Sequence, residues 1–385
     1  MYELATPDEY INWLYSQIFY IVIFFLSMAT ILRISFSSDS KLVQQQTKFV
    51  VPTYILGIII IVFFGVRTYF NAYVVDTFMY DWTWQHIVTE QDVESFVNPN
   101  EKLFGYIQLI LFNLGFHKFE HFLTFVALIY VGGYLFACQR LMKRNIWIAF
   151  IFCISSFSFY SYGVNGIRNG MACSIVLMAI ILISGSKIEK LVAIALMFAA
   201  FNIHRSTLLP SVSAIVSLLF LKEPKYAIGF WFASIIVSFI GGNAMTQFFV
   251  DLGFDDRMES YSRLDDFGNL KESVNVKAGF RIDFILYSIM PIIMAWYVTV
   301  KRNFKDKMYR IIACTYILAN SFWIMVIRSN QSNRFAYLSW FLYPIVIAYP
   351  LLRMNLFEDN QDRKLALILL AYAGFTIFME FIYYG

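Results

Sequence analysis

Long apolar runs alternate with short polar connections along almost the whole chain. A helix that crosses a membrane needs about 20 apolar residues, and about 17 is the usual lower limit. The hydrophobic pattern therefore predicts an all-α polytopic integral membrane protein with about 12 transmembrane or re-entrant helices. The expected helices are Ile18–Ile34, Val50–Val66, Phe122–Cys138, Ile146–Gly163, Ile167–Ser184, Ile188–Ile203, Thr207–Leu221, Ala227–Phe249, Ile282–Val300, Met308–Ile327, Phe335–Leu352 and Leu365–Tyr384.

Two longer polar connections, at about 67–121 and 250–281, interrupt this pattern. Neither is long enough for a separate soluble domain, so we expect residues 1–385 to form a single multi-pass membrane domain. Within the first connection, Leu103–Phe116 is apolar and punctuated by glycine, which predicts a helix that lies in the membrane interface. Loops on a rigid scaffold often carry substrate specificity, so we expect both connections to contribute to function.

The composition agrees with a membrane protein. Of the 385 residues, 59% are hydrophobic and only 15% are charged. The net charge of +4 is small and gives no support for nucleic-acid binding. All four cysteines lie in or at the ends of apolar runs, without Cys-x-x-Cys spacing, which predicts buried, reduced thiols and no disulfide framework.

The basic residues are divided unevenly between the two sides of the membrane that the helices define. Eighteen of the 30 Lys and Arg residues fall in alternate connections, which together hold 7 acidic residues. The positive-inside rule places those connections in the cytoplasm. We therefore expect both termini and the two longer loops on the outer, periplasmic side of the cytoplasmic (inner) membrane.

A polar break within Phe201–Pro210 carries the most informative residues. His204 and Arg205 lie there between two short apolar runs, Ile188–Ile203 and Thr207–Leu221, of 16 and 15 residues. An arginine at the centre of a bilayer costs about 2.5–3.5 kcal/mol on insertion scales, so an apolar chain keeps one only at an interface or in a wet cavity. The break predicts a functional site, and the two runs are either two spans or a re-entrant hairpin.

Four more arginines lie in connections with the same outward orientation: Arg67, Arg168, Arg328 and Arg334. A guanidinium group stays charged and binds phosphoryl oxygens two at a time, so converging arginines favour a phosphate or pyrophosphate ligand. The alternative is that arginines at helix ends reach to the lipid headgroups without a specific ligand.

Arg168 lies in a turn with three glycines, Gly163, Gly166 and Gly170. These glycines permit a close backbone approach, and the helix expected from Ile167 offers unpaired N–H groups to an anion. Tight packing between helices explains the same glycines without a ligand.

The stretch His117–His121 has the His-x-x-Glu-His pattern of some zinc hydrolases. It lies at the end of an apolar run, and a third ligand would have to be a distant carboxylate because the chain has only 4 histidines. We interpret these residues as polar groups at headgroup level, and we predict no metal and no cofactor.

Several short motifs resemble those of the EpsG family of Wzy-like polysaccharide polymerases. They are Gly65–Arg67, Asp76–Tyr80, Ile167–Ala172 with Asn169 in place of the usual Gln, Phe201–Ser206, and Arg334–Tyr337. Their order, spacing and shared outward side extend over about residues 50–350.

The resemblance implies a glycosyltransferase-type polymerase. Its donor and acceptor would be polyprenyl-pyrophosphate-linked oligosaccharide repeat units at the outer face of the cytoplasmic membrane, and polyprenyl pyrophosphate would be released. Membrane lipids and other membrane proteins of polysaccharide assembly would be its partners. By resemblance to the family motifs, His204, Arg205 and Asp76 would be the catalytic residues. Substrate binding would fall to Arg67, Arg168, Asn169, Arg334 and Tyr80. Arg328 is a further substrate-binding candidate because of its outward position beside Arg334.

Two other classes of protein share some of these features. A flippase or transporter of lipid-linked oligosaccharides would also need many helices and a cationic cavity, but it should place charges along a path through the membrane. A membrane O-acyltransferase acting on surface glycans would also use an intramembrane histidine, but it should face a cytoplasmic acyl donor. The outward clustering of the arginines favours the polymerase.

Overall fold

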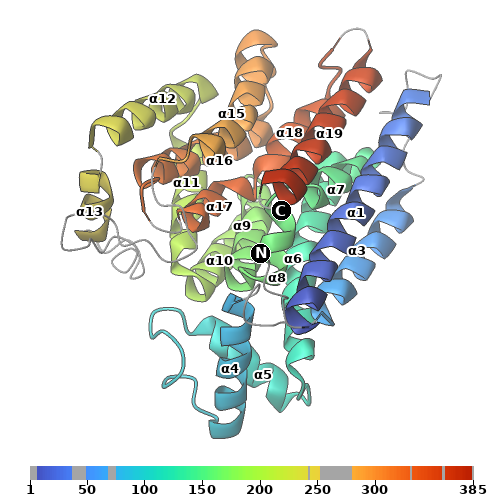
Figure 1. Cartoon of the computed structure of the whole chain (residues 1–385). Helices are drawn as coiled ribbons and strands as arrows, with labels where there is room; N and C mark the ends of the chain where they lie inside the picture. Colours follow the sequence, from blue (N-terminus) through green and yellow to red (C-terminus); the bar gives the residue numbers. More distant parts are fainter. Residues whose placement is uncertain are drawn as a thin grey trace. The chain divides into compact units, whose positions relative to one another are not determined.

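Over the residues that it describes, the computed structural model consists of helices joined by turns and loops, with no strand (Figure 1). The described residues are 7–36, 49–67, 75–241, 243–251, 280–329, 332–357 and 360–383. Most of the expected outer loop at 250–281, and residues 68–74 of the other loop, lie outside these ranges. The chain forms two compact units, which are Met1–His204 with Ala348–Gly385, and Arg205–Ile347.

Within the described residues, six helical segments are long and apolar enough to cross a membrane. They are Trp13–Ser35, Phe119–Ile154, Pro224–Gly241, Ile282–Lys301, Asn333–Arg353 and Gln361–Tyr383. Shorter apolar helices occur at Val50–Gly65, Leu103–Asn113, Ile167–Leu182 and Arg205–Leu219. The expected all-helical, multi-pass membrane character is confirmed, while the count of twelve spans stays a prediction.

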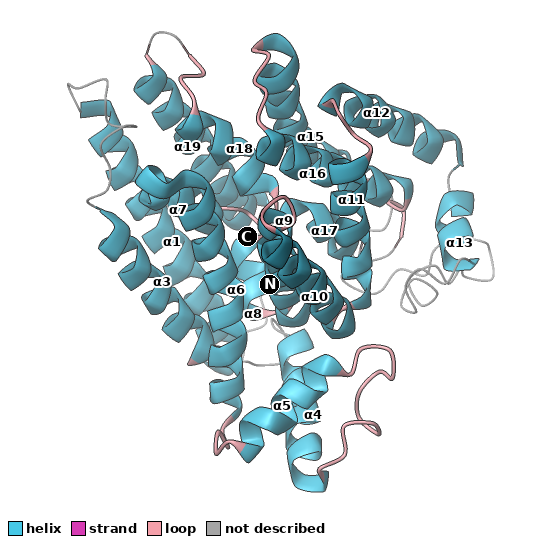
Figure 2. Ribbon diagram, turned by 180° about the vertical axis from the view of Figure 1, so that it is seen from behind, coloured by secondary structure: helices cyan, strands magenta, loops and turns pink. Residues whose placement is uncertain are grey.

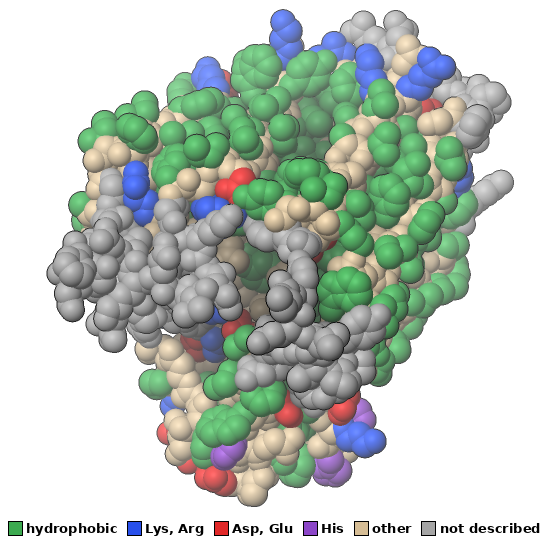
Figure 3. Space-filling model, in the orientation of Figure 1, with side chains coloured by type: hydrophobic (Ala, Val, Ile, Leu, Met, Phe, Trp, Pro, Cys, Tyr) green, Lys and Arg blue, Asp and Glu red, His purple; other side chains and the backbone are tan. Residues whose placement is uncertain are grey.

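Hydrophobic side chains cover much of the visible surface along the helices of both units (Figure 3). Phe25, Ile188 and Ile240, for example, are 67%, 75% and 80% exposed. Large apolar side chains in such numbers are costly in water and favourable in lipid. The surface therefore fits a protein that is embedded in a bilayer.

The first unit is built on helices that pack in pairs: α6 on α9, α9 on α10, α3 on α6, and α1 on α19. Its elements before residue 205 are α1 (Pro7–Phe36), α3 (Val50–Gly65), α4 (Val75–Glu90), α5 (Leu103–Asn113), α6 (Phe119–Met142), η2 (Lys143–Asn145), α7 (Ile146–Ile154), α8 (Phe159–Val164), α9 (Ile167–Leu182) and α10 (Lys187–Ile203). Its C-terminal elements are α19 (Gln361–Phe378) and η5 (Met379–Tyr383), and α18 (Tyr343–Arg353) contains the boundary between the units. Figures 1 and 2 both show α4 and α5 together beyond one end of α6.

The expected helix Ile146–Gly163 is interrupted in the structure. Helix α7 ends at Ile154, and α8 begins only at Phe159. The intervening Ser155 is tied to two other helices, because its Oγ lies 2.9 Å from Ser27 Oγ and its carbonyl oxygen accepts a 2.7 Å hydrogen bond from Thr376 Oγ1. Side-chain hydrogen bonds of this kind compete with helical ones, which explains the break.

The described part of the expected outer connection 67–121 contains two helices, α4 and α5. Helix α5 lies within the apolar stretch Leu103–Phe116, so that stretch is a helix as expected, and its place in the membrane interface remains a prediction.

The start of α10 follows from its sequence. Ser186 accepts a hydrogen bond from the Glu189 backbone N–H at 3.2 Å, and the Glu189 carboxylate accepts one from the Ser186 N–H at 2.7 Å. This reciprocal capping satisfies two N–H groups that the first turn leaves unpaired. The Glu189 carboxylate also forms an ion pair with Arg140.

The second unit packs around α16 (Lys307–Met325), which contacts α11, α12, α15 and α17. Its other elements are η3 (Arg205–Thr207), α11 (Leu208–Leu219), α12 (Pro224–Gly241), α13 (Asn243–Asp251), α15 (Ile282–Trp296), η4 (Tyr297–Lys301) and α17 (Asn333–Trp340). The fully buried Asn320 joins three of these helices, since it accepts from Trp231 Nε1 at 2.7 Å and donates to Ser339 Oγ at 3.0 Å. A satisfied amide inside an apolar core fixes the mutual register of these helices.

Gly170 marks the tightest backbone contact of the α8–α9 turn. A methyl group there would lie 2.3 Å from the Tyr162 carbonyl oxygen, whereas a methyl group at Gly132 would meet nothing within 4 Å. We expect Gly170→Ala to lower the free energy of unfolding by about 1–3 kcal/mol because the backbone must shift. Gly132→Ala is the matched control and should change it by no more than about 1 kcal/mol. Thermal unfolding in one detergent compares the two, and equal stability would contradict close packing at Gly170.

Candidate functional site

Several of the predicted site residues meet at the turn between α8 and α9, all within the first unit. The start of α4 is bonded to this turn by two contacts. Thr77 Oγ1 donates to the Val164 carbonyl oxygen at 2.6 Å, and the Asp76 backbone N–H donates to Asn165 Oδ1 at 3.0 Å. Two motifs that are almost 90 residues apart in the sequence are thereby held together.

Arg67 follows α3 and is 3% exposed. Its guanidinium donates to the carbonyl oxygens of Phe64 and Val164, and Nη2 lies 3.4 Å from Thr77 Oγ1. A buried guanidinium needs several acceptors, and main-chain carbonyls supply them here. In this structure Arg67 links the end of α3 to the α8–α9 turn.

Glu101 joins the two predicted site motifs that contain Arg168 and His204. Its Oε2 lies 3.0 Å from Arg168 Nη1, and its Oε1 lies 3.1 Å from His204 Nδ1. The side chain of Glu101 is 3% exposed, that of His204 is 6% exposed and that of Arg168 is 15% exposed. Charge-assisted hydrogen bonds in such a buried environment are stronger than in water, so these contacts favour the observed arrangement of the three side chains.

The backbone before α5 places Glu101 in this cluster. The Glu101 N–H donates to the Asn98 carbonyl oxygen at 2.9 Å, which closes a turn directly before the helix. Helix α5 then packs against α10, the helix that ends beside His204. A carboxylate near a helix N-terminus is also favoured by the helix dipole.

Glu101 was not among the site residues predicted from the sequence. It lies in a polar stretch, Asn98–Lys102, that is typical of a solvated loop, and 103 residues separate it from His204. Its neighbour Lys102 does face solvent and pairs with the exposed Glu94 at 2.7 Å. The available signal was an acid immediately before an apolar helix, which alone does not identify a buried group.

Tyr80 and Asn169 lie beside the same cluster. The Arg168 Cζ atom is 5.7 Å from the centre of the Tyr80 ring, within the range of a cation–π contact. Asn169 is 7% exposed, and its Oδ1 accepts a 3.2 Å hydrogen bond from the Cys173 thiol. One turn after Asp76 and Thr77, burial raises the pKa of Asp81.

The remaining predicted arginines, Arg205, Arg328 and Arg334, belong to the second unit. Arg205 opens η3, and η3 contacts α17, whose first turn contains Arg334. Arg328 follows α16, and its Cζ atom is 5.6 Å from the centre of the Phe280 ring. All three side chains are half-buried.

A protein-family model, described as the EpsG family, matches residues 53–385. The chain belongs to the EpsG family. No curated protein and no solved structure matches it. Family membership and the apolar helices together support a membrane polysaccharide polymerase in general terms.

In this EpsG-family chain, His117 and His121 of the zinc-like pattern are both exposed. Their rings contact the aromatic rings of Phe112 and Phe116, at centroid distances of 4.7 and 5.6 Å. Among the described residues, no group of three or more His, Cys, Asp or Glu side chains has the arrangement of a metal site.

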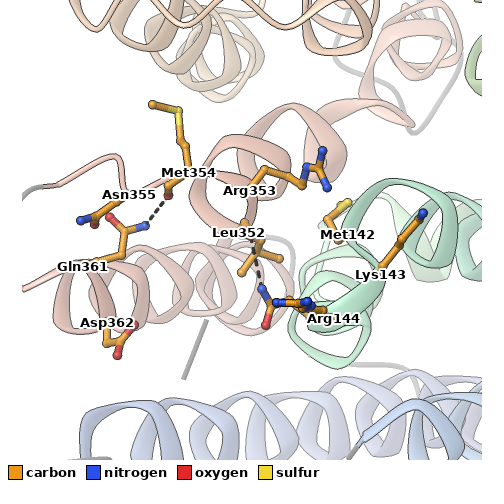
Figure 4. A pocket seen from close by; sticks show the side chains of 10 residues that line it. Met142, Lys143, Arg144, Leu352, Arg353, Met354, Asn355, Gln361 and Asp362 are labelled. Atoms are coloured by element: carbon orange, nitrogen blue, oxygen red, sulfur yellow. Dashed lines mark hydrogen bonds between the residues drawn. The ribbon is translucent and has the colours of Figure 1, made fainter. Parts of the chain in front are cut away.

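A separate cavity of about 480 Å³ lies in the first unit, between the α6–α7 turn and the connection from α18 to α19 (Figure 4). It is lined by Met142, Lys143, Arg144, Asn145, Leu352, Arg353, Met354, Asn355, Gln361 and Asp362. None of the predicted site residues lines it. Its walls are held by hydrogen bonds from Asn145 Nδ2 to the Leu352 carbonyl and from Gln361 Nε2 to the Met354 carbonyl.

Proposed function

We propose that this EpsG-family chain is a glycosyltransferase that polymerises oligosaccharide repeat units linked to polyprenyl pyrophosphate. It would act at the outer face of the cytoplasmic membrane and release polyprenyl pyrophosphate. The observation that carries the proposal is the Arg168–Glu101–His204 cluster, because it joins a phosphate-binding group to an acid–base group. Family membership supports the polymerase class.

The chemistry needs a leaving group and a proton acceptor. An acceptor hydroxyl oxygen forms a bond to the anomeric carbon of the donor, while the bond from that carbon to the pyrophosphate oxygen breaks. Arg168 would stabilise the charge that develops on the pyrophosphate. His204 would take the hydroxyl proton, because an imidazole is well suited to proton transfer near neutral pH.

The other predicted residues would have supporting roles. Arg205, Arg334 and Arg328 are further candidates for pyrophosphate binding, and Asp76 is the second candidate for the base. Arg67 would act mainly by holding the α8–α9 turn in place, since its guanidinium is buried against main-chain carbonyls.

Purified protein and lipid-linked repeat units test the proposal. The expected product is a ladder of glycans that differ by one repeat unit, and the reaction should continue in excess chelator because arginines replace a metal in neutralising the pyrophosphate. Failure to lengthen the glycan would overturn the proposal. Activity that stops in chelator and returns with a divalent ion would overturn only its metal-independent form.

We further propose the orientation in which α4, α5 and both termini lie outside, with twelve spanning or re-entrant helices. Cysteine labelling of the first unit tests the orientation, and the four native cysteines are all buried. Glu94→Cys and Lys118→Cys should react with an impermeant thiol reagent added to intact cells, whereas Lys143→Cys and Lys187→Cys should not. All four positions are exposed. The reverse pattern would place the cluster on the cytoplasmic side.

A further inference from the structure

We infer that Glu101 is a positioning residue that fixes the proton of neutral His204 on Nδ1 and so presents an unprotonated Nε2 to the acceptor hydroxyl. The geometry supports this assignment directly. Glu101 Oε1 lies 3.1 Å from His204 Nδ1, and the pair is almost fully buried. The effect on rate rests on the proposed function, whereas the position of the proton does not.

The tautomer follows from the hydrogen-bonding capacity of the two groups. An ionised carboxylate can only accept hydrogen bonds, so a hydrogen bond from His204 requires a proton on Nδ1. Arg168, at 3.0 Å from the other carboxylate oxygen, favours the ionised form of Glu101. A neutral imidazole carries one N–H proton, so Nε2 then keeps its lone pair.

Glu101→Gln is the informative substitution because glutamine has one acceptor oxygen where glutamate has two. The charged Arg168 can only donate hydrogen bonds and donates more strongly than a neutral imidazole, so the amide oxygen should face Arg168. The amide NH₂ group should then turn toward His204. An NH₂ donor at Nδ1 requires the opposite tautomer, with the proton on Nε2. The substitution should therefore block the base without removing the imidazole.

Nitrogen NMR of labelled histidine reads the tautomer independently of enzymatic activity. The chain has 4 histidines, so the His86→Gln, His117→Gln, His121→Gln variant leaves His204 as the only signal. In this background we expect the Nδ1–H tautomer with Glu101, the Nε2–H tautomer with Glu101→Gln, and recovery of Nδ1–H with Glu101→Asp. A neutral His204 that already carries its proton on Nε2 beside Glu101 would overturn the inference.

A double-mutant cycle provides the kinetic test. Glu101→Gln should lower kcat by on the order of 10–100-fold, which is the usual effect of removing a carboxylate that orients a histidine in metal sites, with little change in donor KM. In a His204→Ala background the same change should have almost no further effect. Glu94→Gln is the matched control, because Glu94 is exposed and pairs with Lys102 at the surface.

The outcomes separate the possible failures. If the loss caused by Glu101→Gln persists in the His204→Ala background, Glu101 acts through Arg168 and the inference is wrong. If Glu101→Gln does not fold, two measurements still test the inference. They are the His204 tautomer beside the native Glu101 and the His204 tautomer in Glu101→Asp. If the parent chain forms no glycan ladder, the proposed function is wrong. The NMR measurement still tests the position of the His204 proton, because it does not depend on activity.

Discussion

His204→Ala is expected to lower the rate of the chemical step by on the order of 10²–10⁴, the usual contribution of a general base. Donor binding should change little, because the imidazole is assigned to the acceptor hydroxyl and not to the pyrophosphate. The fold should survive, since Glu101 keeps its ion pair with Arg168 when the imidazole is removed. Single-turnover rates and donor affinity in one membrane preparation measure the two effects separately.

His121→Ala is the matched control for this experiment. His121 is an exposed histidine near the start of α6 and is outside the cluster. The His121→Ala variant should polymerise at the parental rate. If folded His204→Ala also reaches the parental rate, His204 is a structural residue at a helix end and Asp76 becomes the leading candidate for the base.

Arg168→Lys is expected to lower the chemical step by on the order of 10²–10³, the range found when one electrostatic donor to a transition state is removed. Lysine keeps the positive charge and can still pair with Glu101, but it loses the planar fork that binds two phosphoryl oxygens together. The loss should therefore appear in kcat more than in donor affinity. Single-turnover kinetics at saturating donor measure it.

Arg140→Lys makes the same chemical change outside the site. Arg140 forms an ion pair with the carboxylate of Glu189, and it lies at the end of α6 that is expected in the cytoplasm. The activity of the Arg140→Lys variant should equal that of the parent protein. An Arg168→Lys variant with parental kcat and only weaker donor binding would show that Arg168 contributes to ground-state binding and not to the chemistry.

The helical class and much of the cluster could be predicted from the sequence. Apolar runs of spanning length leave few alternatives to membrane helices, because every backbone polar group in lipid must be satisfied within a helix or a closed barrel. The polar breaks at Arg168 and His204 indicated candidate site residues because polar side chains are costly in lipid. A costly residue in an apolar chain needs a partner or a function.

Long-range partners could not be predicted. Glu101 lies in a stretch that looks solvated, and its burial depends on how α5 packs against α10. The carbonyl oxygens that bind Arg67 belong to two separate segments, so a residue that looked available for a ligand proved to be bonded to the main chain. The helix break after Ile154 similarly depends on hydrogen bonds of Ser155 to helices distant in the sequence.

The most direct measurement of the central claim is the number of polyprenyl pyrophosphate molecules that the purified protein releases for each glycosidic bond it forms. Repeat units with separate labels in the sugar and in the lipid provide both counts in one reaction. We predict one released carrier per new bond, a glycan that grows by whole repeat units, and loss of both signals together in His204→Ala. Lipid-linked units that cross a vesicle membrane without forming a bond or releasing the carrier would contradict the account and identify a transporter.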